Sequence, residues 1–248
     1  MFDVAQAISN KSVLSDLGCR ILTGLVNDVQ FPLISTANAT WEAETATTAA
    51  TTPTFSSVKL SPKRLSVVVP ISKMLLAQDS CGIERAVRNE ITKAIMGKLE
   101  STIFGTAAGS ATQPAGLFTG TISTTIATFA DVCALEASLD GKDYGEKKYL
   151  LSPTAKSTLR GMIKGTNATG MVYEYGDVDG TPALCSGFVD AGKLAYGDWS
   201  NLLVGIWDGL DIVVDNYSLA ADGCVRLVVN FYCDANLLRA GSIAVAKI

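Results

Sequence analysis

The chain has 248 residues, of which 48% are apolar and 18% charged, so it can bury a core and is not intrinsically disordered. Its formal net charge of −4 and its pI near 4.9 argue against a nucleic-acid-binding protein, because such proteins need clustered Lys and Arg to displace counterions from phosphates. No apolar run approaches the roughly eighteen residues of a membrane span, and Met1 to Asn10 lack the basic start and apolar run of a secretory signal. We therefore expect a soluble globular protein made in a cytoplasm, without membrane contact.

Residues with common catalytic and metal-binding chemistry are scarce. The chain has no His, which removes the usual general base, the commonest metal ligand and the partner of Ser or Cys in catalytic triads. Its six cysteines form no C-x-x-C pair, so we expect buried thiols rather than a zinc site or a redox dithiol. They are Cys19, Cys81, Cys133, Cys185, Cys224 and Cys233. Phosphate-binding glycine loops and nucleophile elbows are also absent, and we predict no enzyme, no metal and no cofactor.

The N-terminal region carries two short helical patterns of apolar residues, divided by Ser9 to Ser12. The first contains Val4, Ala7 and Ile8, and the second runs from Val13 to Leu25. We therefore predict two short helices before residue 30.

The segment from Trp41 to Phe55 is rich in Thr and Ala and has no large aliphatic residue, so it cannot build a core of its own. Its composition alone fits a flexible linker equally well. In Val58 to Ser72, however, apolar residues alternate at Leu65, Val67, Val69 and Ile71, as in a strand with one buried face. We interpret the Thr/Ala segment as the tip of a long β-arm that this strand continues.

A long amphipathic helix is predicted from Ile83 to Phe104, closed by Gly105. Its apolar stripe has a spacing of four residues and consists of Ile83, Val87, Ile91, Ile95, Leu99 and Ile103. Four residues of an α-helix turn by about 400°, so each stripe residue lies about 40° further around the helix axis than the one before it. Over the five steps of the stripe this rotation adds up to about 200°. The two ends of the helix should therefore face different partners.

A second, mixed lobe is predicted after Thr119. A Thr-rich link leads to a helix that ends near Leu139, and Lys147 to Leu151 has the pattern of a buried strand. Ser152 and Pro153 then form a good helix start, as N-cap and first helical residue. This helix should end near Gly161 and be followed by turns around a short strand. The segments Val225 to Phe231 and Ser242 to Ile248 are rich in β-forming residues.

The order of extended arm, strand, long helix and Gly-rich turn ending in QPAGLF (Gln113 to Phe118) resembles the major capsid proteins of tailed bacteriophages, with the Hong Kong 97 fold. Three further motifs fit the same order: YLLSPTAKSTLRGM (149–162), DGTPALCS (179–186) and AYGDWSNLLVGIWDGLDIVVD (195–215). The resemblance implies an α+β fold in five parts. These are an N-terminal arm and the start of a peripheral domain (1–35), an extended β-arm loop (36–66), the peripheral domain with a spine helix at 83–104 (67–118), an axial domain (119–221) and terminal strands that return to the peripheral domain (222–248).

The function implied by the resemblance is that of a shell subunit. Copies would self-assemble into hexamers and pentamers of an icosahedral head, which encloses the viral DNA without sequence-specific binding. The expected partners are a portal protein, a scaffold or maturation protease, and possible decoration proteins. The expected location is the virion, after assembly in the host cytoplasm. The chain has no match to the helical scaffolding segment of some members, so it is either a mature product or is served by a separate scaffold.

Intersubunit contacts are expected in the extended loop and at the tip of the axial domain. In and beside the loop they are Trp41, Glu42, Glu44, Phe55, Lys63 and Arg64. Trp41 or Phe55 could instead cap the hairpin of the arm itself. At the axial tip they are Gly165, Asn167 and Gly170, and the N-terminal arm would lie either along a neighbour or on its own chain.

Covalent cross-linking is not expected. In some members a Lys of the extended loop joins an Asn of another subunit, helped by a Glu. Here the loop from Thr40 to Ser57 has no Lys, and Gly223 and Asn230 fall approximately where the Asn and the Glu would lie. The shell would then depend on buried area and arm exchange.

Two alternatives remain open from the sequence. An encapsulin-type compartment has the same fold but encloses an enzyme cargo. A hydrolase with a Ser–Lys pair could use Ser152 and Lys156, although Ser152 is better explained as a helix cap.

Overall fold

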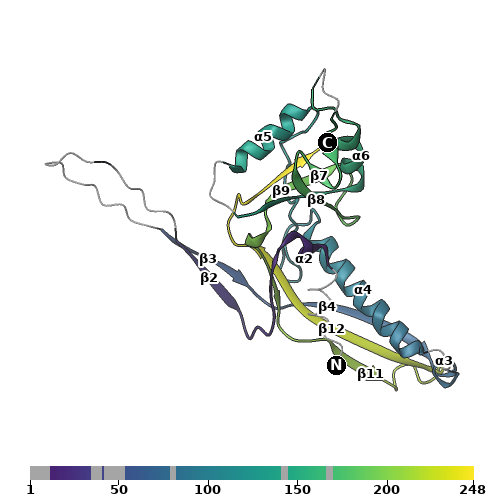
Figure 1. The fold of residues 1–248 in the computed structure, drawn as a ribbon. Coiled ribbons are helices and arrows are strands. Elements are labelled where there is room, and N and C mark those ends of the chain that lie inside the picture. Colours follow the sequence, from purple (N-terminus) through teal and green to yellow (C-terminus); the bar gives the residue numbers. More distant parts are fainter. Residues whose placement is uncertain (1–11, 35–40, 42–53, 79–81, 141–144, 166–169) are drawn as a thin grey trace.

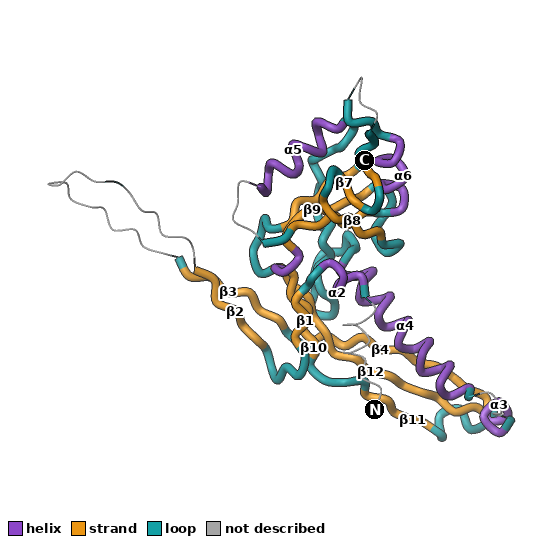
Figure 2. Tube along the Cα trace, in the orientation of Figure 1, coloured by secondary structure: helices purple, strands orange, loops and turns teal. Residues whose placement is uncertain are grey.

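The structure, a computed structural model, describes residues 12–34, 41, 54–78, 82–140, 145–165 and 170–248. Its strands form two sheets in the body of the molecule and a two-stranded ribbon that projects from it (Figure 1). Figure 2 shows the long helix along the first sheet and two shorter helices on the second. The helices are α2 (Val13–Leu17), α3 (Lys73–Ala77), α4 (Ile83–Ile103), α5 (Phe129–Asp140) and α6 (Pro153–Gly161), with a 3-10 turn at Trp199–Asn201.

The first sheet is organised by one long strand, β12. Its strands are β1 (Arg20–Leu22), β4 (Lys63–Ser72), β10 (Leu202–Ile206), β11 (Asp211–Asp215) and β12 (Cys224–Leu237). β4 pairs with one edge of β12, and β10 and β11 follow one another along its other edge. β1 then lies in parallel on the outer side of β10.

The second sheet carries α5 and α6. In spatial order its strands are β13 (Ile243–Lys247), β9 (Lys193–Asp198), β5 (Lys147–Leu151), β8 (Thr181–Cys185), β7 (Asp177–Val178) and β6 (Tyr173–Glu174). The Tyr149 and Tyr196 rings are buried side by side, 4.6 Å between centroids, on the neighbouring strands β5 and β9. Their hydroxyls donate to Glu136 and Asp140, one turn apart on α5, at 2.8 and 3.0 Å. Two aromatic anchors thereby fix α5 to the sheet.

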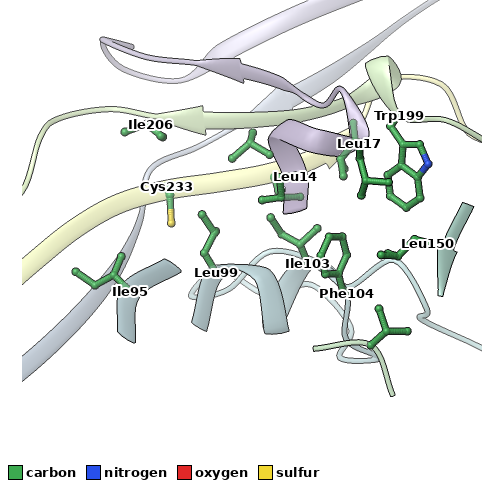
Figure 3. Close-up of a cluster of buried hydrophobic side chains, with 14 of the residues drawn as sticks. Leu14, Leu17, Ile95, Leu99, Ile103, Phe104, Leu150, Trp199, Ile206 and Cys233 are labelled. Atoms are coloured by element: carbon green, nitrogen blue, oxygen red, sulfur yellow. The ribbon is translucent and has the colours of Figure 1, made fainter. Parts of the chain in front are cut away.

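The predicted long helix is confirmed by α4, and the stripe residues Ile91, Ile95, Leu99 and Ile103 are buried along it. Figure 3 shows Ile95, Leu99 and Ile103 directed toward β12 and α2. Phe104, at the end of the helix, is fully buried and meets the ring of Trp199 edge to face, 6.4 Å between centroids. The N-terminal half of α4 therefore lies on the first sheet, and its C-terminal end meets the junction with the second. The helix ends one residue earlier than predicted, with Phe104 as C-cap.

The predicted second N-terminal helix is wrong beyond Leu17. Gly18 adopts a left-handed conformation (φ 91°) and its N–H caps the carbonyls of Leu14 and Ser15, so α2 ends after five residues. The chain then forms β1 and enters the ribbon. The first predicted helix, around Val4 to Ile8, lies outside the described residues.

The sheet pairing divides the chain differently from the predicted domains. β10 and β11 lie in the first sheet, although residues up to 221 were assigned to the axial lobe. β13 pairs with β9 in the second sheet, whereas it was expected to return to the first with β12. The chain thus crosses between the sheets near Trp199 and again after Leu237. Strand patterns in a sequence predict strands but carry no direct information on distant pairing partners.

A buried carboxylate joins α2 to α4. Glu100 is only 6% exposed and its Oε1 accepts a hydrogen bond from the Val13 N–H at 2.9 Å, at the start of α2. Burial raises the pKa of Glu100 above its usual value, and the hydrogen bond from Val13 only partly opposes this.

Glu100 should make the stability of the chain depend on pH. Because its pKa is higher in the folded than in the unfolded state, the folded state gains stability as the pH falls from neutral toward 4.5, the value for an unperturbed Glu. Glu100→Gln keeps an oxygen acceptor for Val13 and removes this titration. Urea unfolding at pH 7 and pH 5 should therefore show a larger gain on acidification for the native chain than for Glu100→Gln. Parallel pH profiles of the two proteins would contradict this role.

Candidate intersubunit interface

The arm is a two-stranded ribbon made of β2 (Val29–Ile34) and β3 (Phe55–Leu60), which pair in antiparallel register from Val29 opposite Leu60 to Ile34 opposite Phe55. An isolated pair of strands is marginally stable in water, because it has too little buried surface of its own. Figure 1 shows the ribbon leading away from both sheets. Its stability must therefore come from its base and from whatever covers its outer end.

The outer end of the ribbon carries uncovered apolar side chains. Ile34 and Phe55 face each other across the two strands and are 64% and 74% exposed. Trp41, in the segment that joins the two strands, is fully exposed. Large apolar side chains gathered at a projecting end are typical of surfaces that another protein covers.

The base of the ribbon is firmly anchored. Leu60 is fully buried in a small cluster with Leu203 and Trp207. The indole N–H of Trp207 donates to the Asn27 carbonyl at 2.5 Å, in the turn that precedes β2. The direction in which the arm leaves the body is thus fixed by buried contacts.

A second anchor is the corner between β3 and β4. The predicted single strand from Val58 to Ser72 is in fact divided here, at Ser61 and Pro62. Asp234 on β12 holds the corner, because its carboxylate accepts from the Ser61 N–H at 3.0 Å and from Lys63 Nζ at 2.5 Å. The Asp234 side chain is nearly buried, so this pair is protected from water.

The predicted loop contacts therefore have different surroundings. Trp41, Phe55 and Arg64 are exposed and available to another chain. Lys63 is engaged within its own chain by Asp234. Glu42 and Glu44 lie outside the described residues. Trp41 and Phe55 have no cover from the described part of their own hairpin.

The predicted axial tip lies between α6 and β6. Its two sides approach each other, with an isolated bridge between Ile163 and Met171 and a hydrogen bond from the Lys164 N–H to the Gly170 carbonyl at 3.2 Å. Gly165 is exposed and Gly170 half-buried. Asn167 lies outside the described residues. The two described flanks are thus held together next to the predicted tip.

The positions compared with the cross-linking residues lie on or next to β12. Gly223 precedes the strand with a positive φ of 65°, a conformation that favours glycine. Asn230 lies within the strand and donates from Nδ2 to Asp211 on β11 at 3.3 Å. These are local structural roles.

Two surfaces were not found from the sequence. A cavity of about 200 Å³ opens between β4, α4 and the 112–114 turn, with the cations Arg64 and Lys98 at its wall. On the face of the first sheet opposite α4, Val68 and Val213 are each 49% exposed on strands that flank β12. The alternation of β4 indicates the valine surface in retrospect, but the cavity is formed by residues far apart in the chain.

The hydrolase alternative receives no support from the geometry. The Ser152 side chain is buried and its Oγ accepts from the Ala155 N–H at 3.1 Å, as a helix N-cap does. The Lys156 ammonium lies over the Tyr173 ring, 5.2 Å from its centroid. Within the described residues no three His, Cys, Asp or Glu side chains are grouped to hold a metal, and no helix is long and apolar enough to span a membrane. The described cysteines are free. Buried thiols were expected, but only Cys233 is buried, while Cys19, Cys133 and Cys224 are partly exposed and Cys185 is exposed.

An anchored ribbon with uncovered apolar residues is typical of subunits that complete their packing with neighbours. The comparisons with known proteins agree with this class. The model of the phage capsid family matches residues 3–248. The chain therefore belongs to the phage capsid family, as the sequence resemblance predicted.

Individual relatives support the same assignment. The chain is 27% identical over 252 residues to the major capsid protein of Halomonas phage phiHAP-1, a match that covers 98% of this chain but only 41% of that protein. The capsid of a native GTA particle superposes with a TM-score of 0.76 at 16% identity, over 100% of this chain and 91% of that one. A structure from Microbacterium phage Oxtober96 gives a TM-score of 0.73 at 16% identity, over 95% and 90% of the two chains. The predicted α+β capsid fold is confirmed.

Proposed function

We propose that this chain is the major shell-forming subunit of a phage head, and that its copies interlock through the arm. The main observation behind the proposal is the anchored ribbon. Ile34 and Phe55 pair at its outer end and are exposed instead of packing into the core of their own chain. Membership of the phage capsid family supports the proposal. On this view the protein is structural and has no enzymatic activity.

The finer features of the proposal follow the family resemblance. Copies form hexamers and pentamers of an icosahedral shell, with the arm of each subunit on a neighbour and the Gly165 to Gly170 projection near the axis of a capsomer. The shell encloses DNA without sequence-specific contacts, in keeping with the net charge of −4. Its location is the virion, after assembly in the host cytoplasm. Its partners are a portal protein, a scaffold or maturation protease, and possible decoration proteins.

The proposal predicts that a change at the outer end of the arm blocks assembly without unfolding the subunit. Phe55→Ser should lower the assembled fraction at least about tenfold, because each arm loses the burial of one aromatic side chain. Phe55→Leu keeps an apolar residue of similar reach and should retain assembly. Negative-stain microscopy and sedimentation velocity would detect rings of six or closed shells, and circular dichroism would confirm folding. A chain that stays monomeric at high concentration and with added scaffold would contradict the function itself.

The contents of the shell separate the phage head from the encapsulin alternative. Particles purified from infected cells should contain nuclease-resistant DNA. An enzyme cargo inside the particles, without DNA, would instead identify a protein compartment.

The shell should also be held without covalent cross-links. Particles boiled in denaturant should give a single band at 26 kDa, the mass of one chain. This is expected because the loop from Thr40 to Ser57 contains no Lys to form an isopeptide bond. A ladder of multiples on the gel would refute the prediction.

A further inference from the structure

An apolar groove lies between the N-terminal half of α4 and strands β11 and β12 of the first sheet. Its volume is about 210 Å³. The wall from α4 includes Val87 and Ile91, and the floor includes Ile212 and Val214 of β11 and Leu227 of β12. The described residues leave Ile212 38% and Val214 54% exposed. The groove is thus an incompletely covered part of the core, continuous with the face on which α4 packs.

The groove exists because one helix covers three strands. The apolar residues of β4 and β12 alternate toward α4, and Ile71, Val229 and Phe231 are buried there. β11 extends the same face by one further strand, on the edge of β12 opposite β4. The side chains of β11 on this face, Ile212 and Val214, therefore need a second element beside α4 to cover them.

The start of α2 lies farther along α4 than the groove, beside the C-terminal half of the helix. The 2.9 Å hydrogen bond from the Val13 N–H to Glu100 places the first residue of α2 beside the C-terminal half of α4. β1, which follows α2, pairs with β10, and β10 shares with β11 the same edge of β12. Residues 1–11, which lie outside the described structure, thus join the described chain at the start of α2, next to this edge of the first sheet.

The attached segment is long enough to reach the groove of its own chain. Along α4, Ile91 and Val87 precede Glu100 by nine and thirteen residues, or about 14 and 20 Å at 1.5 Å per residue. Eleven residues span up to about 36 Å when extended. Even as a helix they span about 16 Å, enough to reach Ile91.

The composition of the segment suits an apolar groove. Phe2, Val4 and Ile8 are apolar, and they are interspersed with small and polar residues. A cavity of about 150 Å³ accepts a benzene ring, so a volume of 210 Å³ can take the Phe2 ring together with part of an aliphatic side chain.

We propose that residues 2–8 of the chain occupy the groove between α4 and β11 of the same subunit, with Phe2 or Val4 inserted beside Val214. The segment completes the cover of β11 and ties residues 2–8 to the spine helix. This occupancy is intramolecular and does not depend on shell formation. A test on dilute subunits is therefore independent of whether the proposed assembly occurs.

Hydrogen exchange of dilute subunits, followed by mass spectrometry, tests the proposal with two neighbouring variants. Val213 and Val214 have similar exposures, 49% and 54%, but lie on opposite faces of β11, and only Val214 lines the groove. Val214→Lys should raise amide exchange in residues 2–8 at least about tenfold, because it places a charge where apolar side chains are buried. Val213→Lys should leave that exchange unchanged within a factor of about two, as expected for a change on the opposite face.

A change on the segment side keeps the test informative if Val214→Lys fails to fold. Val4→Asp should speed amide exchange in β11, because residues 2–8 would no longer cover that strand. This is the converse of Val214→Lys, which should speed exchange in residues 2–8. Both effects should be the same across a hundredfold dilution of the protein. Exchange in residues 2–8 that is fast in the native chain, or protection that disappears on dilution, would overturn the proposal. The second result would place the segment, or the arm, of another copy in the groove.

Discussion

Replacing Trp199 by Ala should lower the free energy of unfolding by about 3–5 kcal/mol, the usual cost of truncating a fully buried Trp. Trp199 is fully buried where the chain passes from β9 to β10, and therefore from the second sheet to the first. Its indole N–H donates to the Lys148 carbonyl on β5 at 2.9 Å, and its ring meets Phe104 at the end of α4. The substitution would leave a cavity in the buried cluster that joins α4 to β5. This cluster lies where the chain passes from the second sheet to the first.

Urea unfolding monitored by circular dichroism would measure the loss. Trp41→Ala is the matched control, because Trp41 is fully exposed and its removal should change the stability of the subunit by less than about 0.5 kcal/mol. A loss below about 1.5 kcal/mol for Trp199→Ala, outside the range for a buried large side chain, would mean that the junction repacks around the cavity.

Gly116→Ala should destabilise the subunit by more than about 3 kcal/mol, at or above the usual cost of overpacking a core. A Cβ at this position would lie 2.2 Å from the Gly105 carbonyl oxygen and 2.6 Å from its carbon, both backbone atoms that cannot rotate away. The neighbouring residues Leu117 and Phe118 donate to the carbonyls of Ile103 and Gly105 at 2.7 and 3.0 Å. Relieving the clash would break these bonds and pull the fully buried Phe118 away from the end of α4.

Gly161→Ala provides the control for Gly116→Ala. Gly161 is the last residue of α6, has open space where a Cβ would stand and should tolerate Ala within about 0.5 kcal/mol. Thermal unfolding of the two variants beside the native chain would compare them directly. Equal melting temperatures for Gly116→Ala and the native chain would show that the QPAGLF turn can shift without cost.

The candidate site was only partly predictable from the sequence. Trp41 and Phe55 stood out because large aromatic residues at the ends of a Thr/Ala tract have no local core to enter. Arg64 and Lys63 looked alike in the sequence, yet only Arg64 is free to meet another chain. The difference arises from Asp234, which is 171 residues away from Lys63 and pairs with it only after β12 has formed beside β4.

The sequence by itself determined the local structure and the family. The four-residue spacing of α4, the alternation in β4 and the Ser152–Pro153 helix start are signals between near neighbours, where side-chain periodicity and backbone capping decide the conformation. Only the tertiary structure decided which sheet each later strand joins, where the arm is anchored and which apolar residues remain uncovered. β10, β11 and β13 have similar strand patterns but different partners, because pairing depends on contacts between residues distant in the chain. The burial of Glu100 and the groove beside β11 arise for the same reason, since each is formed by elements from opposite parts of the sequence.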